Sequence, residues 1–447
     1  MSAPIAPRPS PLARVRRLAG VSGWNLAVAS SADVVSKGLA IVSVALLARA
    51  LGPEAFGTYS TIMAFVTLSL AVGGLGLDRL LYRELSAGLD ALRLYKTTLA
   101  VRRVVVPVVV LAMVAYAMVR GEEVWPWALG ALALVPALES ALLSVLFQAQ
   151  ERFSVPARAT VLHSLATCLY VAILARVEAP IEAYLAGFVA TEGARLAFLR
   201  IQAWDTEWPD TGVEWGRLTG LLRSAAPYAV LTVLGIVYLR IDLIMLDAML
   251  GGAEVGLYAG STRVLFVAAA IPGLCLGVLF PRFVRLQRED PEGSARLYLL
   301  ATRVMIWIGI AVTVTGALSA VPVLRGLYGA DYVAGASALR WLMVALLATF
   351  AHASNGTVLF SSDRLRAVVL ISVVTAGFNV LANLYAIPRW GGEGAAMTTA
   401  ASEILSYLLF TPLVCHRLGV RPWTYARSVL TPRLSRADRN LLLDVPS

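Results

Sequence analysis

Charged residues are scarce in this sequence. Only 15% of the 447 residues are charged, whereas 58% are hydrophobic. A soluble domain typically has about 25% charged residues, and its core could not hide so much apolar surface. The composition therefore excludes an ordinary soluble protein and predicts an integral membrane protein. Its apolar runs of roughly 20 residues fit spanning helices, because the strands of a membrane barrel alternate over only about 10 residues.

Cysteine and histidine are rare as well. Cys168, Cys275 and Cys415 stand alone in separate apolar segments, so they support neither a disulfide framework nor a metal site. The three histidines are scattered, no glycine-rich loop with a lysine is present to bind phosphate, and the loops are too short for a catalytic domain. We therefore expect no enzymatic activity, no metal and no cofactor.

The start of the chain lacks a long apolar stretch. Its first twenty residues contain four prolines and four arginines, which is too polar for the core of a signal peptide. This composition predicts a cytoplasmic N-terminal tail at residues 1–22.

Apolar segments separated by short loops make up the rest of the chain. The longest polar interruption, 203–223, is rich in tryptophan and acidic residues, as expected of an aqueous linker with interfacial aromatics. The prediction is an all-α fold of twelve membrane helices in two six-helix lobes, an N-lobe at 23–202 and a C-lobe at 224–416, followed by a cytoplasmic basic tail at 417–447. The expected spans are 23–48, 57–77, 104–119, 124–149, 159–175, 183–202, 224–247, 254–280, 299–321, 335–360, 367–387 and 394–415.

The positions of the arginines predict the orientation. If the N-terminus is cytoplasmic and the helices alternate, twenty-nine Arg and Lys residues fall in cytoplasmic segments and five in outer loops. Cytoplasmic loops of membrane proteins are enriched in these residues, and an odd number of helices would break the pattern. We therefore predict twelve helices with both termini in the cytoplasm. The arginines of the C-terminal tail are spread over about thirty residues, which favours contact with lipid over binding of nucleic acid.

The two halves of the chain repeat each other. The turn at 47–59 matches the turn at 246–258 at five positions without a gap, and we call these two segments the paired turns. A charged tetrapeptide before the fifth helix likewise resembles one before the eleventh, and each is followed by one span and then by a helix with a central glutamate. Both halves begin in the cytoplasm, so the repeat is parallel, as in transporters whose path lies between two halves. We expect Gly57 and Gly256 in the paired turns to permit tight packing or a special backbone angle.

Charges inside the predicted spans are the first candidate functional residues, since a charge at the bilayer centre costs about 2.5–3.5 kcal/mol. Asp33 and Lys37 lie on one face of the first helix. Lys37 is either a contact for an anionic headgroup, tuned by Asp33, or half of a self-neutralising pair, and the default for intramembrane charges favours the former. Arg240 and Asp242 on the seventh helix do not share a face, so each needs its own partner or water. Arg263 on the eighth helix is either a second cation of this site or the ion-pair partner of Asp242 or Asp247.

Uncharged and acidic polar residues inside the spans form a second group of candidates. Glu139, Glu192 and Glu403 are central on helices four, six and twelve. A lone carboxylate in a membrane can take up and release a proton, which suits coupling to a cation gradient. The alternative is a glutamate hydrogen-bonded to Arg195 or to serine and threonine neighbours. Asn379 and Asn383 share a face of the eleventh helix, where they either bind sugar hydroxyls or join helices.

The paired turns also carry a family resemblance. Leu-Ala-Arg-Ala-Leu-Gly-Pro-Glu-Ala-Phe-Gly-Thr-Tyr at 47–59 resembles the opening signature of bacterial polysaccharide transporters. These are the oligosaccharide-lipid flippases of the multidrug/oligosaccharidyl-lipid/polysaccharide exporter (MOP) superfamily. Arg240-Ile-Asp242 and the turn after it resemble the junction of their seventh and eighth helices, and 391–397 resembles the start of their twelfth. The related lipid II flippases typically have fourteen helices, whereas twelve are predicted here.

The resemblance implies two lobes arranged in a V around a central cavity lined by the first and seventh helices. The implied substrate is an undecaprenyl-pyrophosphate-linked oligosaccharide, moved from the cytoplasmic to the periplasmic leaflet of the bacterial inner membrane by alternating access. Its product would serve synthesis of O-antigen, capsule or exopolysaccharide. Implied partners are membrane lipids, a proton or sodium counter-ion and a polysaccharide polymerase complex.

A pyrophosphate headgroup needs cations, and on this physical argument we expect Lys37, Arg240 and Arg263 to hold it. Two alternatives stay open. One is a cation-coupled small-molecule efflux antiporter of the same superfamily, and the other is a non-transporting membrane scaffold in polysaccharide assembly.

Overall fold

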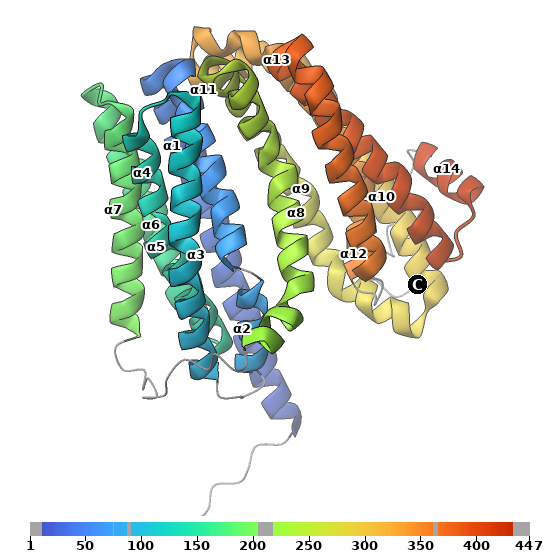
Figure 1. The fold of residues 1–447 in the computed structure, drawn as a ribbon. Helices are drawn as coiled ribbons and strands as arrows, with labels where there is room; N and C mark the ends of the chain where they lie inside the picture. Colours follow the sequence, from blue (N-terminus) through green and yellow to red (C-terminus); the bar gives the residue numbers. More distant parts are fainter. Residues whose placement is uncertain (1–10, 75, 87–90, 204–217, 361–364, 432–447) are drawn as a thin grey trace, which may run out of the picture. The chain divides into compact units, whose positions relative to one another are not determined.

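The structure is a computed structural model that describes residues 11–74, 76–86, 91–203, 218–360 and 365–431. Within these ranges the chain forms α-helices, one short 3₁₀ helix and connecting turns, and no strand (Figure 1). The all-α prediction is confirmed. Most of the predicted linker, half of the predicted N-terminal tail and the end of the predicted C-terminal tail lie outside the described residues.

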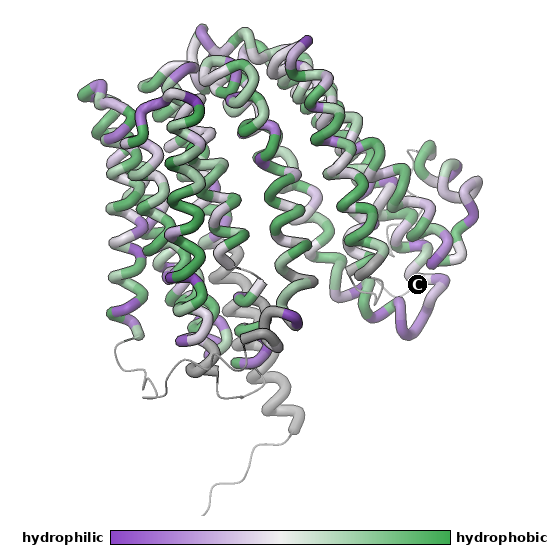
Figure 2. The backbone as a smooth tube through the Cα atoms, in the orientation of Figure 1, coloured by the Kyte–Doolittle hydropathy of each residue, from purple (hydrophilic) through white to green (hydrophobic). Residues whose placement is uncertain are grey.

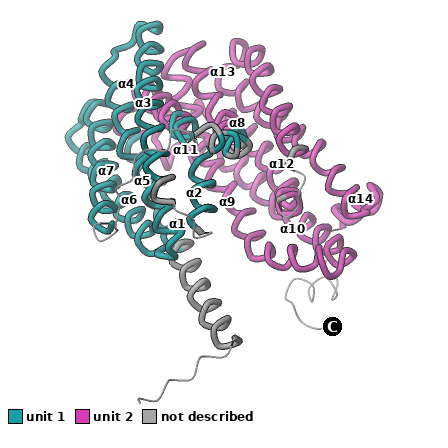
Figure 3. Tube along the Cα trace, turned by 60° about the horizontal axis from the view of Figure 1, so that its bottom comes forward, with its two compact units in different colours: residues 1–47, 69–230 teal, residues 48–68, 231–447 magenta. Residues whose placement is uncertain are grey.

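The chain divides into two compact units, coloured teal and magenta in Figure 3. We call residues 1–47 and 69–230 lobe 1, and residues 48–68 and 231–447 lobe 2. The fold therefore has the two lobes that the internal repeat predicts. Much of the second predicted span groups with lobe 2, although the helices before and after it belong to lobe 1.

The helices follow the predicted spans in chain order. Lobe 1 contains the first part of α1 (Pro11–Gly74), α2 (Leu77–Ser86), α3 (Ala91–Arg120), α4 (Val124–Leu132), α5 (Leu134–Ala149), α6 (Ser154–Arg176), α7 (Ile181–Gln202) and the start of α8 (Leu218–Leu250). Lobe 2 contains the rest of α8, α9 (Gly252–Glu289), α10 (Pro291–Leu318), α11 (Ala320–Tyr328), the 3₁₀ helix η2 (Ala330–Gly335), α12 (Ala336–Phe360), α13 (Leu365–Arg417) and α14 (Pro422–Leu430).

Each predicted span has a helical counterpart. Among the described residues, eight helical stretches are long and apolar enough to cross a membrane. Two of them, in α1 and α13, each hold two spans, because the backbone leaves helical geometry at Gly52 (φ 69, ψ 175) and at Gly391 (φ 54, ψ −137). The sixth and seventh spans correspond to α7 and α8. The twelve-helix prediction is thereby confirmed, while the side of the membrane on which each terminus lies stays a prediction.

Apolar side chains cover the outer faces of the helices. Figure 2 shows hydrophobic residues along the length of the helices and many hydrophilic ones near their ends. On α3, Val104, Val108 and Leu111 are all more than 60% exposed and recur at helical spacing on one face. Such a stripe would be unfavourable in water but is expected where a helix meets lipid.

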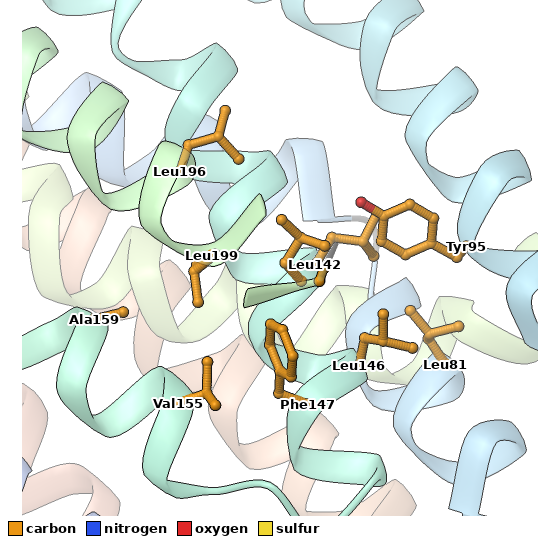
Figure 4. Close-up of a cluster of buried hydrophobic side chains, with 11 residues drawn as sticks. Leu81, Tyr95, Leu142, Leu146, Phe147, Val155, Ala159, Leu196 and Leu199 are labelled. Carbon is orange, nitrogen blue, oxygen red and sulfur yellow. The ribbon is translucent and has the colours of Figure 1, made fainter. Parts of the chain in front are cut away.

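Lobe 1 is held together by a cluster of buried side chains from five helices. Leu142, Leu146 and Phe147 of α5 meet Val155 of α6 and Leu199 of α7 (Figure 4). Lipid tails are as apolar as leucine, so exclusion of water does not drive this contact. Close packing does, since each buried side chain gains many small dispersion contacts. The cluster fixes α5, α6 and α7 against one another and thereby positions the glutamates that they carry.

The paired turns pack directly against each other within lobe 2. A Cβ atom added at Gly57 would lie 1.8 Å from the carbonyl oxygen of Gly252, and one added at Gly256 would lie 1.9 Å from that of Pro53. Gly52 and Gly251 each begin the next helix with a positive φ, 69° and 90°, which favours glycine. Of the two roles expected for Gly57 and Gly256, tight packing is the one found, because these glycines lie where two backbones touch. The special backbone angles belong instead to Gly52 and Gly251, which the sequence analysis did not single out.

Candidate functional site

Asp242 of α8 is the centre of a buried polar cluster in lobe 2. One carboxylate oxygen accepts hydrogen bonds from the Tyr258 hydroxyl at 2.7 Å and from the Thr399 hydroxyl at 2.9 Å. The other oxygen accepts from the side-chain amide of Asn383 at 2.6 Å. All three donors are neutral. The Asp242 carboxyl is thus buried in lobe 2, and the hydrogen-bond partners that the structure describes for it are all neutral.

The two predicted asparagines belong to this cluster. Asn383 donates to the side-chain oxygen of Asn379 at 3.2 Å and accepts from Thr398. Asn379 and Asn383 are at most 1% exposed. Both lie on α13 before its break at Gly391, and Thr398 follows the break, so the bend brings the two spans of α13 to the same carboxylate. Helix joining, one of the two predicted roles, is the contact that these amides make here.

Glu403 of α13 occupies a second buried polar cluster in lobe 2. It accepts a hydrogen bond from the Tyr238 hydroxyl at 2.8 Å and one from Thr349 at 3.1 Å. The Nε2 atom of His352 lies 2.7 Å from the same carboxylate oxygen that Thr349 contacts. Unlike Asp242, Glu403 therefore has a titratable partner. A carboxylate and an imidazole at this distance can share or exchange a proton.

Both acidic residues border one cavity. Its volume is about 130 Å³, and Asp242, Glu403, Tyr238 and Tyr258 contribute its polar lining. The remaining wall is mainly apolar and includes Phe266 of α9. A space of this size holds a few water molecules or a small hydrated ion, but it is much smaller than the pockets of about 300–1,000 Å³ that bind drug-sized ligands. Within lobe 2 it is therefore an ion-sized site.

Arg240 and Arg263 lie close to this cavity and have no acidic partner among the described residues. The Arg240 guanidinium stands 5.5 Å from the ring centre of Phe266, which lines the cavity. The two arginines are near enough to repel each other, and both are half-buried. Arg263 also faces the aromatic residues Tyr59 and Tyr328. The predicted ion pair between Arg263 and an aspartate is not formed, so two cations stand together without a neutralising charge.

Lys37 and Asp33 form the ion pair that their spacing predicts. The Lys37 ammonium lies 2.7 Å from the Asp33 carboxylate, and the two side chains are 63% and 60% exposed. The two charges neutralise each other, which is the self-neutralising alternative that the sequence left open for Lys37.

Two of the glutamates in lobe 1 have basic partners. Glu139 of α5 accepts two hydrogen bonds from the Arg200 guanidinium of α7, at 2.6 and 3.0 Å. Glu192 of α7 lies 3.5 Å from the Nε2 atom of His163 on α6 and 3.8 Å from Arg195. The sequence suggested Arg195 as the partner of a glutamate, and this residue lies beside Glu192. It did not suggest Arg200 as the partner of Glu139.

Histidines are the functional candidates that sequence reasoning missed. Glu192 and Glu403 occupy equivalent places in the two halves of the repeat, and each has a histidine beside it, His163 in lobe 1 and His352 in lobe 2. The chain has only three histidines. Their scarcity was visible in the sequence, but their proximity to the repeated glutamates was not, because His352 and Glu403 lie on different helices.

Comparison with known proteins identifies the family of this chain. A family described as polysaccharide biosynthesis protein matches residues 22–287, which is more than half of the chain. This chain belongs to that family. No match is found among curated proteins.

Solved structures with the same fold are MOP-superfamily transporters. The lipid II flippase MurJ in an inward closed conformation is similar with a TM-score of 0.72 and 11% identity, covering 93% of this chain and 95% of that one. An inward-facing multidrug resistance MATE family transporter of the MOP superfamily has a TM-score of 0.67 and 15% identity, covering 86% and 94%. A variant of the Vibrio cholerae MATE transporter VcmN has a TM-score of 0.57 and 14% identity, covering 90% and 99%. The chain thus has the fold of these transporters.

Proposed function

We propose that this protein moves an undecaprenyl-pyrophosphate-linked oligosaccharide from the cytoplasmic to the periplasmic leaflet of the bacterial inner membrane. The product would feed the synthesis of O-antigen, capsule or exopolysaccharide. The observation that carries the proposal is the pair of half-buried, unneutralised arginines, Arg240 and Arg263, in lobe 2. Two guanidinium groups that repel each other within a membrane are unfavourable until an anion binds between or beside them.

A pyrophosphate is an anion suited to this pair. Guanidinium groups bind phosphate oxygens through short, charge-assisted hydrogen bonds and often through two at once. The glycan and the lipid then need only weak contacts, as expected of a carrier that must release its substrate on the other side.

The alternative of cation-drug efflux is less well supported. A pocket for organic cations needs accessible carboxylates and few basic residues. Here the carboxylates of Asp242 and Glu403 are each occupied by three hydrogen-bond contacts, whereas the arginines are the unpaired groups.

We assign coupling to a cation gradient to the two acidic residues of that cavity. Asp242 lacks a basic partner and is surrounded by amide and hydroxyl groups, so a proton or a sodium ion would neutralise it. Glu403 is beside His352 and would exchange protons with it. Binding of the cation changes the charge of the lobe that carries Arg240 and Arg263, which provides a physical link between the ion and the anionic substrate. In lobe 1, Glu192 with His163 is the corresponding candidate, whereas Glu139 with Arg200 has a structural role.

Deletion of the gene in its native host, followed by lipid analysis, tests the function. We expect lipid-linked repeat units to accumulate on the cytoplasmic side and to disappear when the wild-type gene is restored. Unchanged lipids together with increased drug sensitivity would instead support efflux. A scaffold would be supported if Lys37→Ala and Arg240→Ala together had no consequence for the lipids or the polymer.

A further inference from the structure

The short helix α14 lies beside the end of a membrane span. It begins at Pro422, five residues after α13 ends at Arg417, and the stretch up to Arg417 is long and apolar enough to cross a bilayer. Five residues reach at most about 18 Å. The length of this connection therefore holds α14 near the surface of the membrane.

One face of α14 is docked onto lobe 2 through Tyr425. Its side chain is buried, its ring stacks on that of Tyr298 in α10 with 6.2 Å between centres, and its hydroxyl lies 3.2 Å from that of Tyr407 in α13. Tyr298 donates a hydrogen bond to Asn355 of α12 at 2.8 Å, and Asn355 donates to Thr411 of α13 at 3.0 Å. The orientation of α14 is thereby fixed by α10 and α13, and Tyr298 links this contact to α12.

The opposite face of α14 carries apolar and cationic side chains together. Trp423 and Leu430 are 74% and 75% exposed, and Arg427 is exposed as well. These residues are four and three apart, so they share one face of the helix. Arg417 and Arg421 in the connection are also exposed. The sequence has no Asp or Glu from 404 to 431 that could neutralise them.

This combination fits a surface of anionic lipid. Tryptophan is enriched at the boundary between headgroups and acyl chains, and arginine is attracted to the anionic headgroups there. Water alone would leave the indole and the leucine exposed. A purely apolar protein partner would leave three arginines without a negative charge. The lipid interface satisfies both kinds of side chain and is already within reach.

We propose that α14 lies in the membrane interface and binds anionic phospholipid headgroups through Arg421 and Arg427, with Trp423 and Leu430 among the acyl chains. Because Tyr425 joins α14 to α10 and α13, bound anionic lipid stabilises this end of lobe 2. The proposal does not depend on which substrate the transporter carries.

The position of α14 can be measured with a spin label at Trp423→Cys, after replacement of the three native cysteines. The protein is reconstituted in nanodiscs of phosphatidylcholine with an equal amount of phosphatidylglycerol. We expect the label to be accessible to oxygen and shielded from a water-soluble nickel chelate, like a reference label at Leu169→Cys on the lipid-exposed face of α6. Access to the chelate equal to that of a label at the exposed Glu123→Cys would overturn the proposal. Protection from both reagents would also overturn it, since that result indicates a protein partner or a second copy.

The contribution of the arginines is measured by thermal unfolding in nanodiscs with and without phosphatidylglycerol. We expect the anionic lipid to raise the Tm of the wild type, and we expect R421Q/R427Q to lose that rise. The matched control is R176Q/R340Q, which removes the same charge from two exposed positions elsewhere and should keep the rise. An equal rise in R421Q/R427Q and in the control would contradict headgroup binding by α14.

Discussion

Replacing Gly256 with alanine should destabilise lobe 2 although only one methyl group is added. The new Cβ would lie 1.9 Å from the carbonyl oxygen of Pro53, whereas Cβ contacts under 3.0 Å are essentially never found. One of the two backbones must therefore move by about 1.1 Å, the difference between these distances. No side chain can yield instead, because the obstacle is a backbone carbonyl. Overpacking of this kind costs about 1–3 kcal/mol.

The matched control is Gly277→Ala in the same helix, α9. A Cβ at Gly277 meets nothing within 4 Å, and alanine favours a helix over glycine by about 0.8–1 kcal/mol. Thermal unfolding of the two purified variants in the same detergent compares them directly. We expect Gly256→Ala to lower the Tm and Gly277→Ala to leave it unchanged or raise it. Equal Tm values for the two variants would refute the close approach of the paired turns.

Three further predictions concern the polar groups. Asp242→Asn keeps the shape of the side chain but removes the ionisable group. Transport in proteoliposomes should then lose its response to an imposed proton or sodium gradient. An unaltered response would exclude Asp242 from coupling. Arg102 is 2% exposed and lies 2.5 Å from Asp78. Arg102→Leu should therefore lower the free energy of unfolding by about 2–3 kcal/mol, because its partners lose their hydrogen-bond donor. A change within experimental error would show that the pair contributes nothing. A double-mutant cycle with His352→Gln and Glu403→Gln should give an interaction energy on the order of 1 kcal/mol, and additive effects would mean that the two side chains act independently.

The fold was accessible from the sequence because its determinants are local or periodic. Apolar runs specify the spans, arginines specify the alternation of loops, and the repeated turns mark the two halves. Gly57 and Gly256 could be singled out because the repeat selects them from the many other glycines. The pairing of Lys37 with Asp33 was also predictable, since both lie on one helix at a spacing of four residues.

The polar clusters were only partly accessible because their members come from distant parts of the chain. Asp242 is 141 residues from Asn383 and 157 from Thr399. A sequence indicates that Asn379 and Asn383 share a face, but not which helix that face meets. The sequence therefore allowed two roles for the asparagines, binding of sugar hydroxyls and contact between helices. His352 was missed for the same reason.

Some expectations from the sequence stay predictions because they concern how the protein sits in the membrane and what it carries. The arginine distribution predicts cytoplasmic termini, and the described helices are compatible with either orientation. The comparisons establish the polysaccharide biosynthesis family and the fold, and transport is our proposal from them. The lipid-linked oligosaccharide is inferred from the unpaired charges of Arg240 and Arg263.

The most direct test of the account is therefore the rate of flipping by the arginine variants. Proteoliposomes containing a fluorescent undecaprenyl-pyrophosphate-linked oligosaccharide report flipping as loss of access to a membrane-impermeant quencher. We expect R240Q/R263Q to slow flipping by about tenfold or more, since a hydrogen bond to a charged group contributes about 1.5–3 kcal/mol. Arg340→Gln, an exposed arginine of lobe 2, should flip at the wild-type rate. A wild-type rate in R240Q/R263Q would contradict the proposal that these two arginines hold the pyrophosphate.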